Sequence, residues 1–166
     1  MPEKKTVERA KKDARKGKAP STQAGEFVRE EMVHIREGKH GARSTKQAIA
    51  IGLSKARRAG VKLTPPKRGT TSERTWKQAA RNYAQGQTPG SRTPSPTRSR
   101  ATRTALQREG KQSASRAALA RQARASARIR GAASRRQAAL KAVRTKGKAG
   151  LRRAARKAAR TRAAHA

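Results

Sequence analysis

The sequence has no cysteine and little material for a hydrophobic core. Without cysteine there is neither a disulfide framework nor a thiolate metal site. Phe, Ile, Leu and Val together number 16 in 166 residues, about 10% of the chain, and a highly charged chain below roughly 20% is expected to be disordered. Ordering the backbone costs about 1–2 kcal/mol per residue. A single compact core for the whole chain is therefore not expected.

Acidic residues are scarce as well. Nine Asp and Glu stand against 45 Lys and Arg, which gives a net charge of +36. Self-repulsion of this size opposes compaction unless a polyanion neutralises it, so nucleic acid is the expected partner, ahead of an anionic membrane surface. No apolar run approaches 18 residues, which excludes a predicted membrane span. We expect a cytoplasmic protein associated with the nucleoid.

Catalytic and metal-binding patterns are also missing. No P-loop, nucleophile elbow or catalytic carboxylate pair is recognisable, so we expect neither an enzyme nor a cofactor. His34 and His40 have no third histidine nearby and no H-E-x-x-H spacing. They are expected to be ordinary surface histidines, with no metal bound. Glu30 and Glu31 are expected to complement the dipole of their helix and to form salt bridges.

Two amphipathic helices are predicted between residues 21 and 63, after a basic N-terminal arm at 1–20. The first covers 22–37, has a continuous apolar face and ends at Gly38. The second follows a short turn and ends near Gly60. Val61 and Leu63 are expected to close the open end of this helical hairpin. The face of the first helix consists of Ala24, Phe27, Val28, Met32 and Ile35.

The second helix has a clear start signal. Ser44 and Gln47 have capping-box spacing, in which each side chain satisfies a free backbone N–H of the other. Its apolar stripe is Ile49, Leu53 and Ala56. Gly52 beside the stripe costs about 1 kcal/mol relative to alanine, which suggests a close approach of the two helices.

A third helix is predicted within 64–86 on different signals. Thr70 and Glu73 repeat the capping-box spacing, and Trp76, Ala80 and Tyr83 make one face. Core packing is the expected role of the two aromatic residues, although stacking on bases is the alternative. A Pro/Ser/Thr-rich linker without apolar residues follows at 87–99.

The remaining residues, 100–166, form a tail rich in Ala, Arg and Lys. From residue 98 onward there are 22 basic residues and one acidic residue, so more than half of the net charge lies here. A loose repeat, "RAALARQAR", "RQAALKAVR" and "RRAARKAAR", is separated by Gly110, Gly131, Gly147 and Gly150. Each unit is near or below the length at which an isolated helix is marginal. We expect disorder in water and helix formation on phosphate binding.

Residues 30–63 resemble a known family. "EEMVHIREGKHGARSTKQAIAIGLSKARRAGVKL" is similar to a small bacterial family catalogued as a domain of unknown function, and the match is closest at Lys46 to Ser54, "KQAIAIGLS". Members are commonly labelled as DNA-binding proteins, or sometimes as plasmid-stabilisation proteins, and the resemblance implies DNA binding here. The tail is similar in style to histone-like and linker-histone tails. The resemblance supplies no catalytic residue.

These patterns together predict a mainly α fold. It would be a small helical hairpin or three-helix module with long disordered or conditionally helical basic arms. The expected function is non-sequence-specific DNA binding and compaction by a nucleoid-associated, histone-like protein. One alternative is a ribosome-associated or RNA-chaperone protein that binds RNA. Another is a partner-docking or self-associating module with a localising tail.

The expected nucleic-acid contacts fall into two groups. Arg43 and Lys46 surround the start of the second helix, where free N–H groups and the dipole favour phosphate; a plain capped helix is the alternative. The contacts from the module are Lys39, Arg43, Lys46, Arg57 and Arg58. Those from the tail are Arg116, Arg121, Arg124, Arg128, Arg130, Arg135, Arg136, Lys141, Arg144, Arg152, Arg153, Arg156, Lys157, Arg160 and Arg162.

Overall fold

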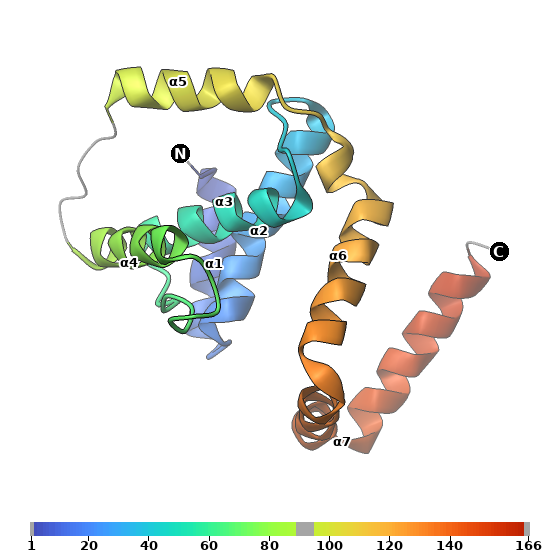
Figure 1. The fold of residues 1–166 in the computed structure, drawn as a ribbon. Coiled ribbons are helices and arrows are strands. Elements are labelled where there is room, and N and C mark those ends of the chain that lie inside the picture. Colours follow the sequence, from blue (N-terminus) through green and yellow to red (C-terminus); the bar gives the residue numbers. More distant parts are fainter. Residues whose placement is uncertain (1, 89–94, 165–166) are drawn as a thin grey trace. The chain divides into compact units, whose positions relative to one another are not determined.

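The computed structural model describes residues 2–88 and 95–164 (Figure 1). The chain forms two compact units, Met1–Ala120 and Arg121–Ala166, and each is considered by itself. The first unit contains α1 (Lys4–Arg15), α2 (Pro20–Glu37), α3 (Thr45–Arg58), α4 (Glu73–Gln87), α5 (Pro96–Gln107) and the short 3-10 helix η1 (Gln112–Ala114). Helix α6 (Arg116–Ile129) starts in the first unit and ends in the second, and α7 (Gly131–Ala163) lies in the second. The described residues contain no strand.

The N-terminal segment is part of the folded unit rather than a free arm. Helix α1 packs on α2 and buries Thr6 and Ala10, while Val7 lies against the core. An ion pair between Arg9 and Glu26, 3.0 Å from Nε to Oε2, joins the same two helices. The sequence indicates this packing only weakly, because Val7 is the one large apolar residue on the buried face of α1.

Helices α2 and α3 form the predicted hairpin, with a seam made of small residues. Gly38 ends α2 in the left-handed conformation, at φ 80°. Ala48, Gly52 and Ala56 are the buried residues along the centre of α3, whereas Ile49 and Leu53 flank them and are only partly buried. A Cβ atom on Gly52 would lie 2.7 Å from the Cα of Val28. The predicted close approach of the two helices at Gly52 is therefore confirmed.

The start of α3 realises half of the predicted capping box. The Ser44 hydroxyl accepts a hydrogen bond from the Gln47 N–H at 3.2 Å. The Gln47 side chain does not return to the Ser44 N–H; its Oε1 accepts from the N–H of Arg43 at 2.8 Å. The cap and the preceding turn are therefore both held by one glutamine.

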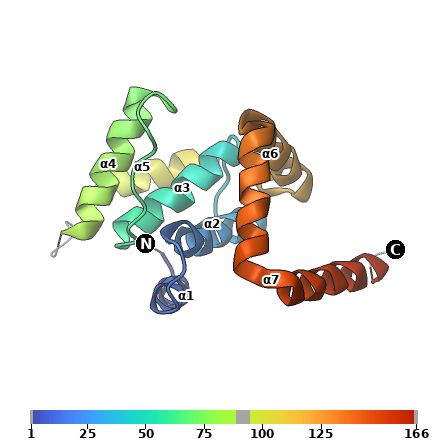
Figure 2. The ribbon, with the colours of Figure 1, turned by 90° about the horizontal axis from the view of Figure 1, so that it is seen from below.

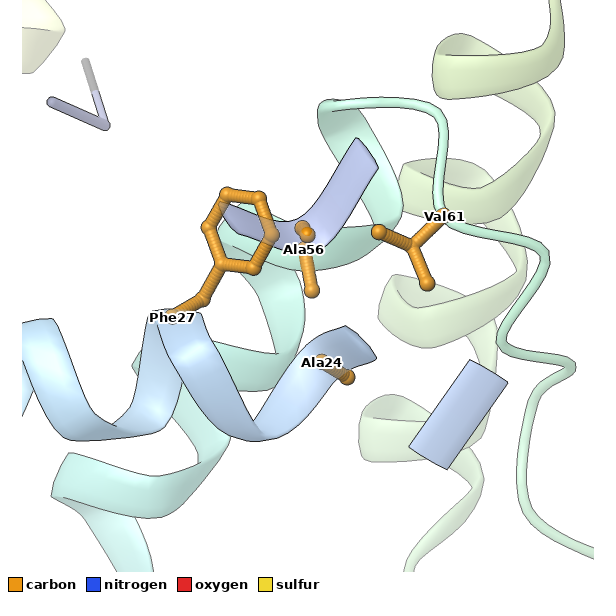
Figure 3. Close-up of a cluster of buried hydrophobic side chains, with 5 residues drawn as sticks. Ala24, Phe27, Ala56 and Val61 are labelled. Atoms are coloured by element: carbon orange, nitrogen blue, oxygen red, sulfur yellow. The ribbon is translucent and has the colours of Figure 1, made fainter. Parts of the chain in front are cut away.

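One apolar cluster closes the end of the hairpin where α1, α2 and the C-terminus of α3 meet. Figure 3 shows Ala24, Phe27 and Ala56 directed toward one another, with Val61 from the segment after α3 beside them. Phe27 and Ala56 have no exposed surface, and Leu63 packs against the cluster. Val61 and Leu63 close this end as predicted.

A second apolar cluster brings a distant segment onto the hairpin. Ala114 is fully buried in a cluster with Met32, Ile35, Ala42 and Ala48, and Leu119 packs against them. Backbone hydrogen bonds run from the N–H of Gly41 to the Leu106 carbonyl at 2.8 Å and from that of Ala42 to the Gly110 carbonyl at 3.1 Å. The start of the predicted tail thus belongs to the first unit, because alanine-rich helices can bury small faces that no periodicity marks.

The predicted third helix is present as α4 and packs on α3 (Figures 1 and 2). The N-cap of α4 is Ser72 and not Thr70, so the helix starts two residues later than expected. The Ser72 hydroxyl accepts a hydrogen bond from the N–H of Thr75 at 3.3 Å. Its buried residues are Ala79 and Asn82. Trp76 and Tyr83 are only half-buried, and the guanidinium of Arg68 lies 4.2 Å from the Trp76 ring centroid.

The fold is mainly helical, as predicted, but the module is not a small hairpin or three-helix unit. Its clusters draw on α1, α2, α3, η1 and the start of α6, and α4 adds to α3. Over the residues that it describes, the structure does not show the expected disordered arms. The segments predicted as arms contain the helices α1, α5, α6 and α7. Helix α5 begins at Pro96, inside the linker expected at 87–99, and 89–94 of that linker lie outside the described residues.

The second unit consists of the end of α6 and the long α7, and its described residues include none that is buried. Gly131 and Gly147 adopt positive φ angles of 68° and 62°; α7 begins at the first, directly after α6, and is kinked at the second. These are two of the glycines expected to separate the repeats, whereas Gly150 lies within the helix. Among the described residues, no helix is long and apolar enough to cross a membrane.

Candidate nucleic-acid interface

The second unit presents a dense array of exposed cations. The predicted contacts within it are all exposed: Arg121, Arg124, Arg128, Arg130, Arg135, Arg136, Lys141, Arg144, Arg152, Arg153, Arg156, Lys157, Arg160 and Arg162. Arg116 is exposed at the start of α6 in the first unit. Residues 121–166 contain no Asp or Glu, so no carboxylate side chain of this unit competes with a phosphate for these cations.

Helical spacing orders part of this charge into rows. Arg152, Arg156 and Arg160 are four residues apart in the part of α7 that follows the Gly147 kink, and positions four apart lie on one helix face. Arginine also forms paired hydrogen bonds with phosphate oxygens, which a lysine ammonium does not. The arrangement suits contact with successive phosphates of a polyanion.

The start of α3 is less open than the sequence suggests. Thr45 is buried, and its hydroxyl donates to the carbonyl of Ser113 at 2.7 Å. The Ser44 hydroxyl is engaged by the helix backbone. The phosphate seat expected here is thus partly covered by η1, and the alternative of a plain capped helix fits better. Arg43 and Lys46 remain exposed at its rim.

Lys39 is held by carboxylates. Its Nζ lies 3.0 Å from Oε2 of Glu37 and 3.5 Å from Oε1 of Glu3. The hydrogen bond to Glu37 is the main cause that raises the pKa of Lys39 above its ordinary value. A phosphate would have to compete with both carboxylates for this ammonium. Lys39 is therefore a weaker candidate for phosphate contact than the other exposed residues of the first unit.

Arg57 and Arg58 differ although they are neighbours. Arg57 is 7% exposed, and its guanidinium donates to the Leu63 carbonyl at 3.1 Å and to the Thr64 carbonyl at 3.5 Å. Burial lowers the pKa of Arg57 below its ordinary value. Arg57 therefore anchors the segment after α3 and is not available to nucleic acid, whereas Arg58 is exposed.

An acidic cluster lies between α2 and α3. Glu30 and Glu31 are buried in α2, and Lys55 from α3 lies between them, with Nζ 2.6 Å from Oε2 of Glu31 and 3.6 Å from Oε1 of Glu30. Neither glutamate is in the first turn of α2, so the predicted interaction with the helix dipole is wrong, whereas the predicted salt bridges are present.

His34 and His40 join this acidic cluster and are not ordinary surface histidines. Their side chains are 12% and 14% exposed, and their ring centroids are 6.2 Å apart. His34 Nε2 lies 2.8 Å from Oε1 of Glu3, and this hydrogen bond is the main cause that lowers the pKa of Glu3. The cluster was not predicted from the sequence, because its third member is the glutamate Glu31 and not a third histidine. The signal available was the Glu31-x-x-His34 spacing, which places both residues on one helix face.

Comparison with known proteins bears on the first unit. The model of a family of unknown function, DUF6496, matches residues 3–68. The matched range includes α1, α2 and α3 and therefore covers residues 30–63. No curated protein matches the chain. No solved structure matches it either.

Proposed function

We propose that the protein is a nucleic-acid-binding protein that compacts duplex DNA without reading its sequence, in the manner of nucleoid-associated, histone-like proteins. It acts by charge neutralisation and not as an enzyme. The observation that carries this proposal is the second unit: 16 basic residues and no acidic residue occur in 121–166, and the predicted contacts among them are all exposed.

The physical basis is counterion release. Each Lys or Arg that neutralises a phosphate frees condensed cations, so the logarithm of the binding constant falls with the logarithm of the salt concentration by about 0.9 per contact on duplex DNA. Such contacts fix position and affinity but carry no sequence information. A unit whose described residues are all at least partly exposed can adapt its helices to the duplex, because Gly131 and Gly147 turn the chain between the repeats.

The first unit has a different part in this proposal. Its clusters give the chain a folded body, and Arg43, Lys46 and Arg58 add exposed cations to it. We assign it the role of positioning the basic helices. Docking of a protein partner or self-association through this unit is the alternative that the sequence leaves open.

A charge-matched comparison tests the assignment to the second unit. In the full-length protein, Arg152, Arg156 and Arg160 are replaced together by Gln. The control replaces Lys4, Lys11 and Lys12, exposed on α1, by Gln and so removes the same net charge. Binding to random-sequence duplex DNA is measured across a salt series. We expect the slope to fall by roughly 0.9 for each phosphate that the α7 variant no longer neutralises and by less in the control.

Equal slopes in both variants would remove α7 as the main binding element. Structured RNA and single-stranded DNA serve as competitors at matched salt. Preferential binding of structured RNA would favour the ribosome-associated or RNA-chaperone alternative. Tight duplex binding with little dependence on sequence is the outcome that the proposal requires.

A further inference from the structure

The cluster around Glu31, His34 and His40 is unusual for its charge. Four carboxylates, those of Glu3, Glu30, Glu31 and Glu37, meet the ammonium groups of Lys39 and Lys55 there. Four negative and two positive charges leave a net charge of −2 when both imidazoles are neutral. A concentrated negative site stands out in a chain with a net charge of +36.

The donor atoms converge. One imidazole nitrogen of each histidine and one carboxylate oxygen of Glu31 all lie within 4.8 Å of one another. Nε2 of His40 is 3.3 Å from Oε1 of Glu31. Two ligands of a tetrahedral zinc ion with bonds of about 2.0–2.1 Å are separated by about 3.3 Å, so this pair already has the spacing of two ligands on one ion.

In each histidine, one ring nitrogen lies within hydrogen-bond distance of an acceptor outside the group of Glu31, His34 and His40. His40 Nδ1 lies 3.1 Å from the Gly41 carbonyl, which can only accept. His34 Nε2 lies 2.8 Å from Oε1 of Glu3. When these nitrogens donate, Nε2 of His40 and Nδ1 of His34 keep the lone pairs. Metal-binding histidines usually donate their other ring N–H to a carboxylate or a backbone carbonyl in this way.

This tautomer leaves an electrostatic conflict that a cation would remove. A lone pair on His40 Nε2 then faces the carboxylate oxygen Oε1 of Glu31, and two acceptors stand 3.3 Å apart. Among the described residues, both carboxylate oxygens of Glu31 are buried without a hydrogen-bond partner. Oε2 forms an ion pair with the ammonium of Lys55 at 2.6 Å, whereas Oε1 lies against the His40 ring. Oε1 is therefore the oxygen that is left for a metal.

We propose that Glu31, His34 and His40 form a binding site for a divalent transition metal, with Zn²⁺ as the ion that best fits two imidazoles and one carboxylate. Three protein ligands leave a fourth position for water, as in other zinc sites with two histidines and one glutamate. Lys55 positions the Glu31 carboxylate, and Glu3 positions the His34 ring.

The site has a structural consequence for the first unit. His40 immediately precedes Gly41 and Ala42, whose N–H groups bind the carbonyls of Leu106 and Gly110. A metal that joins His40 to α2 therefore fixes the loop on which this distant segment docks. Zinc binding should raise the thermal unfolding temperature of the protein, because a ligand that binds only the folded state stabilises it by mass action.

The test uses the full-length protein, freed of nucleic acid and stripped of metal with a chelator. Zn²⁺ is titrated calorimetrically into the natural sequence and into the separate variants His34→Ala, His40→Ala and His165→Ala. We expect one Zn²⁺ per chain and a loss of affinity of at least about 100-fold in the first two variants, since removing outer partners alone costs about 10–100-fold. His165→Ala, which removes the third histidine of the sequence, should bind like the natural protein.

Two measurements on the natural protein do not depend on the folding of variants. Co²⁺ in the site should give the visible d–d absorption of a tetrahedral complex, which Zn²⁺ then abolishes by displacement. Zn²⁺ should also protect His34 and His40, but not His165, from acylation of the imidazole, as located by mass spectrometry. Zinc binding that is unaffected by the His34 and His40 variants, or no protection of these two rings, would overturn the proposal.

Discussion

The hydroxyl of Thr45 donates to the backbone carbonyl of Ser113 at 2.7 Å, and this buried hydrogen bond joins residues 68 positions apart in the chain. Thr45 is the first residue of α3, and Ser113 lies in η1. The hydrogen bond connects the segment with the family match to residues far outside the matched range. It shows that the folded unit extends well beyond the predicted hairpin.

We predict that Thr45→Val destabilises the first unit. The substitution keeps the shape of the side chain but leaves the Ser113 carbonyl without its buried donor, which costs about 1–3 kcal/mol. Urea unfolding followed by circular dichroism measures the change. Thr71→Val, at an exposed position before α4, is the matched control and should have little effect. Equal losses in both variants would mean that docking of η1 contributes nothing measurable.

Gly52→Ala should destabilise the protein in spite of the better helix propensity of alanine. Alanine gains about 1 kcal/mol in a helix interior, but its Cβ would lie 2.7 Å from the Cα of Val28 and would force α2 and α3 apart. Gly25→Ala in α2 is the control, since its Cβ meets nothing within 4 Å, and it should stabilise the protein. Opposite signs in thermal unfolding are the expected result, and a stabilising Gly52→Ala would contradict the close packing.

Arg57→Gln should lower stability without a direct effect on nucleic-acid binding. The variant loses the donors to the carbonyls of Leu63 and Thr64, and leaving buried groups unsatisfied costs about 1–3 kcal/mol. Arg58→Gln provides the comparison at an exposed position. Below the unfolding temperature of both variants, the salt dependence of DNA binding should be unchanged for Arg57→Gln. A reduced slope for this variant would show that Arg57 reaches phosphate.

The double variant Arg43→Gln, Lys46→Gln should weaken DNA binding modestly and leave stability unchanged. Both side chains are exposed at the rim of α3, and each phosphate contact contributes about 0.9 to the salt slope. A decrease larger than that of the α7 triple variant would place the main interface on the first unit instead. Fluorescence anisotropy with labelled duplex DNA over a salt series measures both variants side by side.

Some of these features were predictable from the sequence because their causes are local. The Ser44 cap and the Gly38 stop act within a turn or two of helix, so α2 and α3 were predicted with nearly correct bounds. The exposed charge of the second unit was predictable for a similar reason. Residues 121–166 contain no Asp or Glu to pair with the basic side chains and few large apolar residues to bury them.

Other features depend on contacts between segments distant in the chain. The burial of Thr6 and Ala10 in α1, the docking of Ala114 and the burial of Arg57 required neighbours that no periodicity in those segments reveals. The same holds for Glu31 and His40, which are joined only because the turn after Gly38 folds back on α2.

The sequence by itself determined the composition-driven properties of this protein: its strong positive charge, its helical character and the limits of its central helices, because propensity, capping and charge are local or additive. Within the first unit, only the tertiary structure decided which charges are exposed and which are buried. That outcome depends on long-range packing, which places Arg57 beside two backbone carbonyls and brings Glu3 and Glu31 against the rings of His34 and His40.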